Sequence, residues 1–163
     1  MSDTHSQVIE LLRAESDAIA KAAARLEPGD IDRAIDLLAK CRGKVIVLGV
    51  GKSGIIGQKI AATMTSSGTA ALFLHPSDAL HGGLGIVTAD DAVVMLSNSG
   101  ETSELLELLP YLKQRNVPLI AILGNLNSSI AQRADVVIDA SVDQVACPLN
   151  LAPTASTTVA LAL

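Results

Sequence analysis

The 163-residue sequence has almost no aromatic side chains, because Phe73 and Tyr111 make up the whole 1% share. Binding modes that stack bases on aromatic rings, as on single-stranded nucleic acid, are therefore disfavoured. The formal net charge is −5 and Lys and Arg form no cluster, so the electrostatic footprint of a nucleic-acid-binding protein is also missing. We predict a small-molecule ligand and no nucleic-acid partner.

Cysteine and long apolar runs are scarce as well. Cys41 and Cys147 are too few for a disulfide framework and lack the spacing of metal ligands. No apolar run approaches the roughly 18 residues that a membrane span needs, and the amino terminus has no apolar signal core. We predict a cytoplasmic protein that has no membrane partner and uses no metal or cofactor.

Aliphatic residues supply the core, since hydrophobic residues make up 49% of the sequence. Five short and mostly continuous aliphatic runs alternate with helix-type stretches. Continuous runs are typical of strands buried on both faces, and the alternation is typical of βαβ units. The sequence predicts an α/β fold, a three-layer α/β/α sandwich around a five-stranded parallel flavodoxin-like sheet. The strands are expected at residues 44–50, 70–75, 91–97, 117–123 and 134–140, and the helices between them at 53–67, 103–115 and 128–133.

Two helices are expected before the first strand. Apolar residues recur at helical spacing over residues 6–26, "PGD" at 28–30 interrupts the pattern, and Asp30 is predicted to cap a second helix over 31–41. We expect residues 1–43 to be part of the same domain as residues 44–163. The two helices would pair with another subunit or cover an edge of the sheet.

The fold class predicts where a ligand binds. In open α/β sheets, ligands bind beyond the carboxyl ends of the strands, at the point where the strand order reverses. In a flavodoxin-like order this point lies between the first and third strands. The loops that follow these strands are "GVGKSG" and "SNSGET", so we predict that they form the site.

The loop "GVGKSG", residues 49–54, formally matches the dinucleotide pattern G-x-G-x-x-G. That function also needs an acid at the end of the second strand, which is absent here, and Ile46 stands where a Walker loop needs glycine. Two features that both motifs use are nevertheless present. Gly51 allows the backbone to approach a ligand closely, and the amino terminus of a helix attracts anions. Lys52 would add a positive charge and Ser53 a hydroxyl.

The loop "SNSGET", residues 97–102, places three hydroxyl groups at the start of a helix. Helix capping explains one of them but hardly three. Together with backbone amides, they suit a phosphate monoester. The predicted substrate-binding residues of this loop are Ser97, Asn98, Ser99, Gly100 and Thr102. Thr154 and Ser156, which open the last helix pattern, would also turn hydroxyls inward, although a threonine-rich helix start is equally common.

Proton transfer would need a base, for which Glu101, Glu104, Glu107, His75 and His81 are the candidates. Glu107 points away from the apolar stripe of its helix, whereas Glu104 lies on the flank of this stripe. Partial burial there would raise the pKa of Glu104 towards the range of a base. His81 precedes two glycines in a predicted loop close to the ligand, although a lone histidine is more often structural.

Four segments, in this order, resemble the sugar isomerase (SIS) domain family and within it the arabinose-5-phosphate isomerase branch. They are "GVGKSGIIGQKIAATMTSSGT", "FLHPSDALHGGLG", "SNSGETSEL" and "CPLNLAPTASTT". The resemblance implies a parallel α/β sandwich and homo-oligomers, usually tetramers. It also implies interconversion of D-ribulose 5-phosphate and D-arabinose 5-phosphate, on the path to the Kdo sugar of lipopolysaccharide and some capsules.

The same resemblance assigns roles to residues. Ser97, Ser99 and Thr102 match the phosphate loop of the family, with Ser53 nearby. Aldose–ketose isomerisation through an enediol needs a base and a donor near the enediolate oxygens. The resemblance matches Lys52 to a lysine implicated in catalysis, Glu104 to a glutamate and His81 to a histidine of the family's site. We therefore expect Glu104 to be the base, Lys52 the charge stabiliser and His81 an aid to ring opening or proton shuttling.

Two features depart from the pattern of the family. Val145 stands where the family commonly carries a glutamate, and the sequence ends at Leu163 within a predicted helix. We therefore expect a truncated form without the paired CBS domains that the family often adds. A non-catalytic sugar-phosphate-binding module, such as a sensor, is the alternative function.

Overall fold

A single parallel sheet organises the protein, seen in a computed structural model that describes residues 4–143 and 153–163. Its strand order is β2-β1-β3-β4-β5, so the predicted flavodoxin-like order is confirmed. β1 pairs with both β2 and β3, and the strand order therefore reverses between β1 and β3. The strands are β1 (Val45–Gly49), β2 (Ala71–Phe73), β3 (Ala92–Ser97), β4 (Leu119–Leu123) and β5 (Val136–Asp139).

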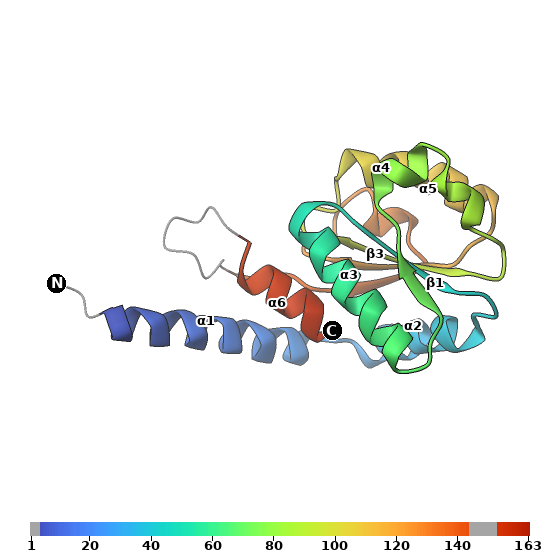
Figure 1. The fold of residues 1–163 in the computed structure, drawn as a ribbon. Coiled ribbons are helices and arrows are strands. Elements are labelled where there is room, and N and C mark those ends of the chain that lie inside the picture. Colours follow the sequence, from blue (N-terminus) through green and yellow to red (C-terminus); the bar gives the residue numbers. More distant parts are fainter. Residues whose placement is uncertain (1–3, 144–152) are drawn as a thin grey trace.

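Helices cover both faces of the sheet (Figure 1). α4 and α5 lie on one face, whereas α2, α3 and α6 lie on the other. The helices are α1 (Thr4–Arg25), α2 (Pro28–Lys40), α3 (Gly51–Ser66), α4 (Pro76–Leu80), α5 (Ser103–Gln114) and α6 (Ala155–Ala162), with 3₁₀ turns at Gly83–Ile86 and Ala131–Arg133.

The strand residues alternate between two buried clusters. Ile46 and Leu48 pack with the leucines of α5 on one side of the sheet, whereas Val45 and Val47 pack with α2, α3 and α6 on the other. Every residue of β1, β3 and β4 is buried. Burial on both faces is the physical reason why these strands appear in the sequence as continuous aliphatic runs.

Two local expectations were wrong. Asp30 does not cap α2, because the helix begins earlier, at Pro28, and Asp30 lies inside its first turn. Proline suits the first helical position, since it has no N–H group to leave unpaired there. No helix was expected after β2, but residues 76–80 form the short helix α4, with the Nδ1 atom of His75 accepting the Ser77 N–H at its start. His81 lies in the turn that follows it, as expected.

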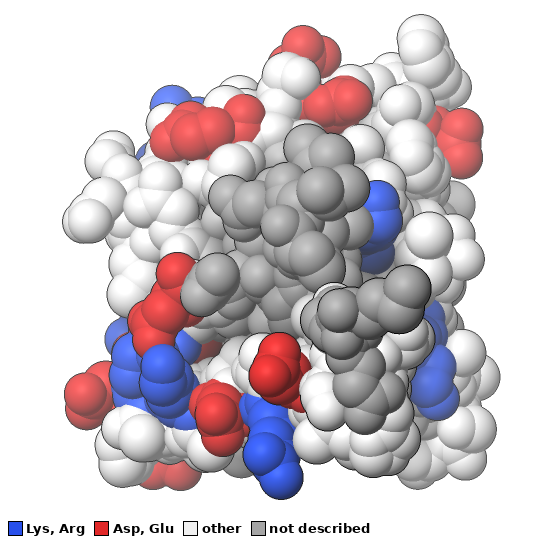
Figure 2. Space-filling view, turned by 90° about the vertical axis from the view of Figure 1, so that its left-hand side faces the viewer, with Lys and Arg blue, Asp and Glu red and all other residues white. Residues whose placement is uncertain are grey.

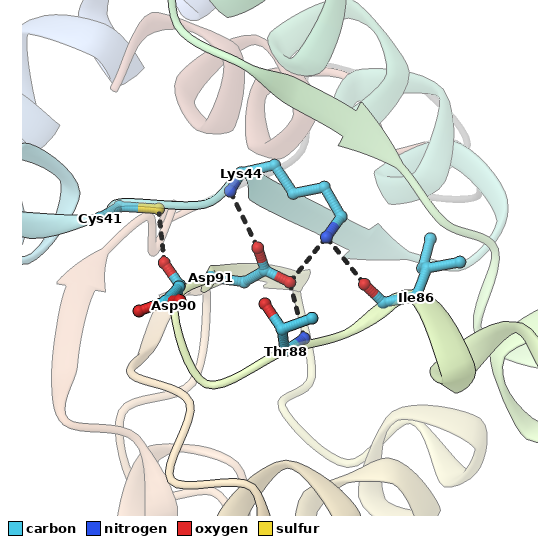
Figure 3. A network of polar contacts seen from close by, with 6 residues as sticks. All are labelled: Cys41, Lys44, Ile86, Thr88, Asp90 and Asp91. Carbon is cyan, nitrogen blue, oxygen red and sulfur yellow. Dashed lines mark hydrogen bonds and ion pairs between the residues drawn. The ribbon is translucent and has the colours of Figure 1, made fainter.

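A buried carboxylate joins the amino-terminal ends of β1 and β3 (Figure 3). The Asp91 side chain has no solvent exposure, and its two oxygens accept the Lys44 N–H at 2.9 Å, the Lys44 Nζ at 2.8 Å and the Thr88 N–H at 2.8 Å. Burial alone would raise the pKa of Asp91, but these hydrogen bonds outweigh it and hold the pKa below its usual range. The network lies at the opposite end of the sheet from the expected site.

α1 runs past the edge of the sheet and lies beside α6 (Figure 1). Near its carboxyl-terminal end, Lys21 pairs with Asp143 at 2.7 Å and Arg25 pairs with Asp139 of β5 at 3.2 Å. On the face shown in Figure 2, side chains of both charges lie among one another. Among the described helices, we find none with the length and apolarity that a bilayer crossing requires.

Candidate functional site

A cavity of about 500 Å³ opens where the two predicted loops meet, beyond the carboxyl ends of β1 and β3. Its volume is typical of small-molecule sites. The polar residues that line it are Lys52, Ser53, Ser97, Asn98, Ser99, Thr102, Ser156 and Thr157. The other lining residues are Val50, Ile56, Leu96, Ile122, Gly124, Ala140, Pro153 and Ala160.

The loop after β3, residues 97–102 and hereafter the phosphate loop, is held in shape by its own hydroxyls. The Oγ atom of Ser97 accepts the Gly100 N–H at 3.0 Å and lies 2.9 Å from the Thr102 Oγ1 atom. Ser99 Oγ accepts the Glu101 N–H at 3.2 Å. The Ser97–Thr102 contact uses one of the three hydroxyl hydrogens of the loop, so two remain for a ligand as far as the described residues show. The loop is therefore a preformed set of neutral hydrogen-bond donors.

The loop after β1 brings a cation to the same cavity. Gly51, with φ of +59°, begins α3, and the side chain of the N-cap residue, Val50, makes no capping hydrogen bond. The first turn of α3 therefore keeps the partial positive charge that favours an anion. Lys52 and Ser53 follow at once and line the cavity.

Two of the glycines in "GVGKSG" have a packing role instead of a nucleotide-binding one. A Cβ atom at Gly49 would lie 2.9 Å from the carbonyl oxygen of Ser53, and one at Gly54 would lie 2.8 Å from the carbonyl oxygen of Gly49. Gly49 and Gly54 thus allow α3 to pack directly on the end of β1. This close packing accounts for the spacing that resembles a dinucleotide motif.

α6 contributes further residues to the cavity lining. Ser156 is buried and lines the cavity, and its Oγ atom has no hydrogen-bond partner among the described residues. The hydroxyl of Thr154 is also buried and unpartnered within the same described part of the chain, but Thr154 does not line the cavity. An unpaired buried hydroxyl is costly, which is consistent with a ligand that completes the hydrogen bonding of Ser156.

Glu104 lies in the first turn of α5 and is half-buried, but it does not line the cavity in the described structure. Its Oε2 atom accepts the Ser103 hydroxyl at 2.9 Å. Hydrogen bonds from its own backbone N–H and from Ser103, together with the nearby His75, hold the pKa of Glu104 below its usual range. The expected rise in this pKa was therefore wrong, because hydrogen bonds to the charged form outweigh partial burial.

His81 ends α4 and is exposed, with its backbone N–H bonded to the Ser77 carbonyl oxygen. In the described part of the chain it does not line the cavity, and neither do Gly51 and Gly100, whose contribution is to the backbone of the two loops. Val145 lies outside the described residues.

The far wall of the cavity was not predicted from the sequence. It is formed by Ile122 of β4, by Gly124 and Ala140, which directly follow β4 and β5, and by Thr157 and Ala160 of α6. A glycine directly after a buried strand was the one local signal, since Gly124 follows β4. A Cβ atom at Gly124 would lie 2.2 Å from the Asn98 Oδ1 atom, so this glycine allows the phosphate loop to approach.

Comparison with known proteins places this geometry in a family. The sequence matches the SIS domain family over residues 37–163. The arabinose 5-phosphate isomerase KdsD of Pseudomonas aeruginosa is 51% identical over 149 residues, which are 91% of this chain and 45% of that protein. The chain spans about half the length of the curated relatives it matches.

Two solved structures share the fold across almost the whole chain. An Escherichia coli CFT073 protein, determined in complex with arabinose 5-phosphate, is 41% identical with a TM-score of 0.85, covering 99% of this chain and 87% of that one. A Listeria monocytogenes protein is 32% identical with a TM-score of 0.94, covering 99% and 86% respectively. The cavity thus sits in the same fold as a structure that holds a sugar phosphate. On the match over residues 37–163 and this agreement in fold, the chain belongs to the SIS domain family.

Proposed function

We propose that this chain is an aldose–ketose isomerase that interconverts D-ribulose 5-phosphate and D-arabinose 5-phosphate. The observation that carries the proposal is the cavity at the switch point, in which the neutral donors of the phosphate loop meet Lys52. The 51% identity to an arabinose 5-phosphate isomerase supports this choice of reaction and substrate.

The phosphate group of the substrate binds to the phosphate loop. Its oxygens accept the two remaining hydroxyl hydrogens, and the amino terminus of α3 adds backbone N–H groups and partial positive charge. Ser156 donates its unpaired hydroxyl from α6. The apolar floor, which includes Leu96 and Ile122, excludes water from the carbon chain.

The chemical step moves one proton between adjacent carbons. A base removes a proton from C1 of ribulose 5-phosphate, an enediolate forms, and protonation at C2 with transfer of a proton between the two oxygens gives the aldose. Lys52 stabilises the negative charge that develops on the enediolate oxygens. Glu104 is the proposed base, because it matches a glutamate of the family and lies two residues after Thr102, which lines the cavity. His81 assists ring opening or proton shuttling.

The proposal includes the cellular compartment, the pathway and the oligomeric state of the enzyme. We place it in the cytoplasm, as a step towards the Kdo sugar of lipopolysaccharide or capsule. We also propose a homo-oligomer, a tetramer, in which α1 contributes to a subunit contact. Its exposed apolar side chains, among them Val8 at 50% and Leu12 at 62% exposure, support this assignment.

A non-catalytic sugar-phosphate-binding module is the second candidate. It is favoured by one observation, because neither Glu104 nor His81 lines the described cavity. A module of this kind would bind the phosphate group equally well but would exchange no proton.

The deciding experiment is incubation of the chain with ribulose 5-phosphate in deuterated water. We expect arabinose 5-phosphate to form and to carry deuterium at C2. Glu104→Gln should abolish deuterium exchange, while the Kd for ribulose 5-phosphate stays within about twofold of that of the unaltered chain. The reason is that the carboxylate acts in the chemical step and does not bind the phosphate group. Glu107→Gln, an exposed position on the same helix, is the matched control and should keep full turnover.

Saturable binding without exchange in the unaltered chain would overturn the isomerase and leave the binding module. Full exchange in Glu104→Gln would remove Glu104 from the role of base.

A further inference from the structure

A second loop packs against the phosphate loop. This loop, residues 124–130 and hereafter the β4 loop, follows β4. At its start the Gly124 N–H donates to the Ser97 carbonyl oxygen at 3.3 Å, and at its end the Ile130 N–H donates to the Gly100 carbonyl oxygen at 3.2 Å. The β4 loop thus holds the phosphate loop at two points through the backbone.

Glu101 adds a third connection, through its side chain. Its Oε1 atom accepts the Ser129 N–H at 2.7 Å. Hydrogen bonds to a carboxylate are among the stronger ones in proteins. Its neighbours Ser99 and Thr102 line the cavity, but Glu101 does not in the described structure. The carboxylate of Glu101 therefore binds the β4 loop and is not part of the described cavity lining.

The two loops also interlock closely. Gly100 is buried with φ of +66°, and a Cβ atom there would lie 1.9 Å from the Oγ atom of Ser128. Ser128 is fully buried, and its Oγ atom accepts the Ala131 N–H at 3.4 Å. A side chain larger than hydrogen would push the phosphate loop off the β4 loop. The position of the phosphate loop is therefore set by the β4 loop and not by its own sequence alone.

We propose that Glu101 is a positioning residue for substrate binding: its hydrogen bond to Ser129 holds the phosphate loop in the shape that receives the phosphate group. Neutral hydroxyls and amides bind an anion well only when they are aimed before the ligand arrives, because ordering a loop on binding costs affinity. Glu101 does this without touching the substrate. The inference rests on the proposed function, since the ligand is the phosphate end of the sugar phosphate.

The test compares Glu101→Ala with Glu101→Gln in the full chain. The carbonyl oxygen of Gln accepts the same N–H, whereas Ala cannot. We expect Glu101→Ala to raise both the Kd and the KM for ribulose 5-phosphate about five- to tenfold, with kcat within about twofold. This is below the usual range for a hydrogen bond to a charged group, because the bond is exposed to solvent. Glu101→Gln should restore most of the affinity. Hydrogen exchange at the Ser129 amide should accelerate in Glu101→Ala and stay slow in Glu101→Gln.

Glu107→Ala is the matched control, because Glu107 is an exposed acid nearby, on the helix α5 that follows the phosphate loop, and it should leave Kd, KM and Ser129 exchange unchanged. The inference is overturned if Glu101→Ala binds ribulose 5-phosphate as tightly as the unaltered chain, if Glu101→Gln is as weak as Glu101→Ala, or if the loss appears in kcat with KM unchanged. Failure of the unaltered chain to bind ribulose 5-phosphate would instead overturn the proposed function, so the two failures are distinguishable.

Discussion

Replacement of Asp91 by Asn should strongly destabilise the fold while leaving the site intact. Asp91 is 2% exposed and accepts three hydrogen bonds, two from backbone N–H groups and one from the Lys44 ammonium (Figure 3). An Asn side chain has only one acceptor oxygen, so in either orientation its NH₂ group faces at least one N–H donor. Lys44 also loses its counter-charge, although it keeps its hydrogen bond to the Ile86 carbonyl oxygen at 2.7 Å.

The magnitude follows from these contacts. Removing one partner of a buried ion pair costs about 3 to 5 kcal/mol, and we take about 3 kcal/mol because the Lys44 side chain is 28% exposed. For a chain of this size, each kcal/mol lowers the melting temperature by about 2 to 4 °C. We expect the melting temperature of Asp91→Asn to fall by about 6 to 12 °C.

Thermal unfolding followed by circular dichroism at pH 7 is the assay, and Asp90→Asn is the matched control. Asp90 pairs with Arg42 at 2.7 Å, but their side chains are 55% and 84% exposed, so the pair contributes at most about 1 kcal/mol. The Kd for ribulose 5-phosphate should stay unchanged in both variants at 25 °C, because the network lies at the other end of the sheet from the cavity. A melting temperature of Asp91→Asn within about 2 °C of the unaltered chain, or an equal fall in Asp90→Asn, would refute the reasoning.

Three more outcomes are expected. Gly100→Ala should abolish binding of ribulose 5-phosphate. Adding Ser128→Gly should restore part of the binding, because it removes the Oγ and Cβ atoms that the new methyl group meets at 1.9 and 2.4 Å. Calorimetry that shows no recovery in the double variant would contradict this steric account. The lowered pKa of Asp91 means that its contribution to stability is present above its unfolded pKa of about 4 and is lost as the pH falls through its lower folded pKa. The difference in melting temperature between Asp91→Asn and the unaltered chain should therefore narrow below about pH 4, and a constant difference would argue against the network. Lys21→Ala should change the melting temperature by less than about 2 °C, because Lys21 and its ion-pair partner Asp143 have side chains that are 59% and 66% exposed. A larger fall would show that this ion pair anchors α1.

Much of the site could be predicted from local patterns. The five aliphatic runs located the strands because a strand buried on both faces must be apolar throughout. Once the class of sheet was known, the rule for switch points placed the site at the two loops that do line the cavity. The hydroxyls of Ser97, Ser99 and Thr102 stood out because capping would use only one of them.

Other features depend on contacts between distant segments. The direction of the pKa shift of Glu104 was missed because it is set by hydrogen bonds from Ser103 and its own backbone and by the nearby His75, which a helical wheel does not contain. The α4 helix was missed because its five residues are too few for a periodic pattern.

The sequence by itself determined the class of fold, the loops of the site and the chemistry of their side chains, because these follow from the local order of apolar, glycine and hydroxyl residues. Only the tertiary structure decided that the β4 loop supports the phosphate loop, through the Glu101–Ser129 hydrogen bond and the close contact of Gly100 with Ser128. These partners are 28 positions apart along the chain. They meet because neighbouring parallel strands end at the same edge of the sheet, which is a property of the packed sheet and not of any single segment.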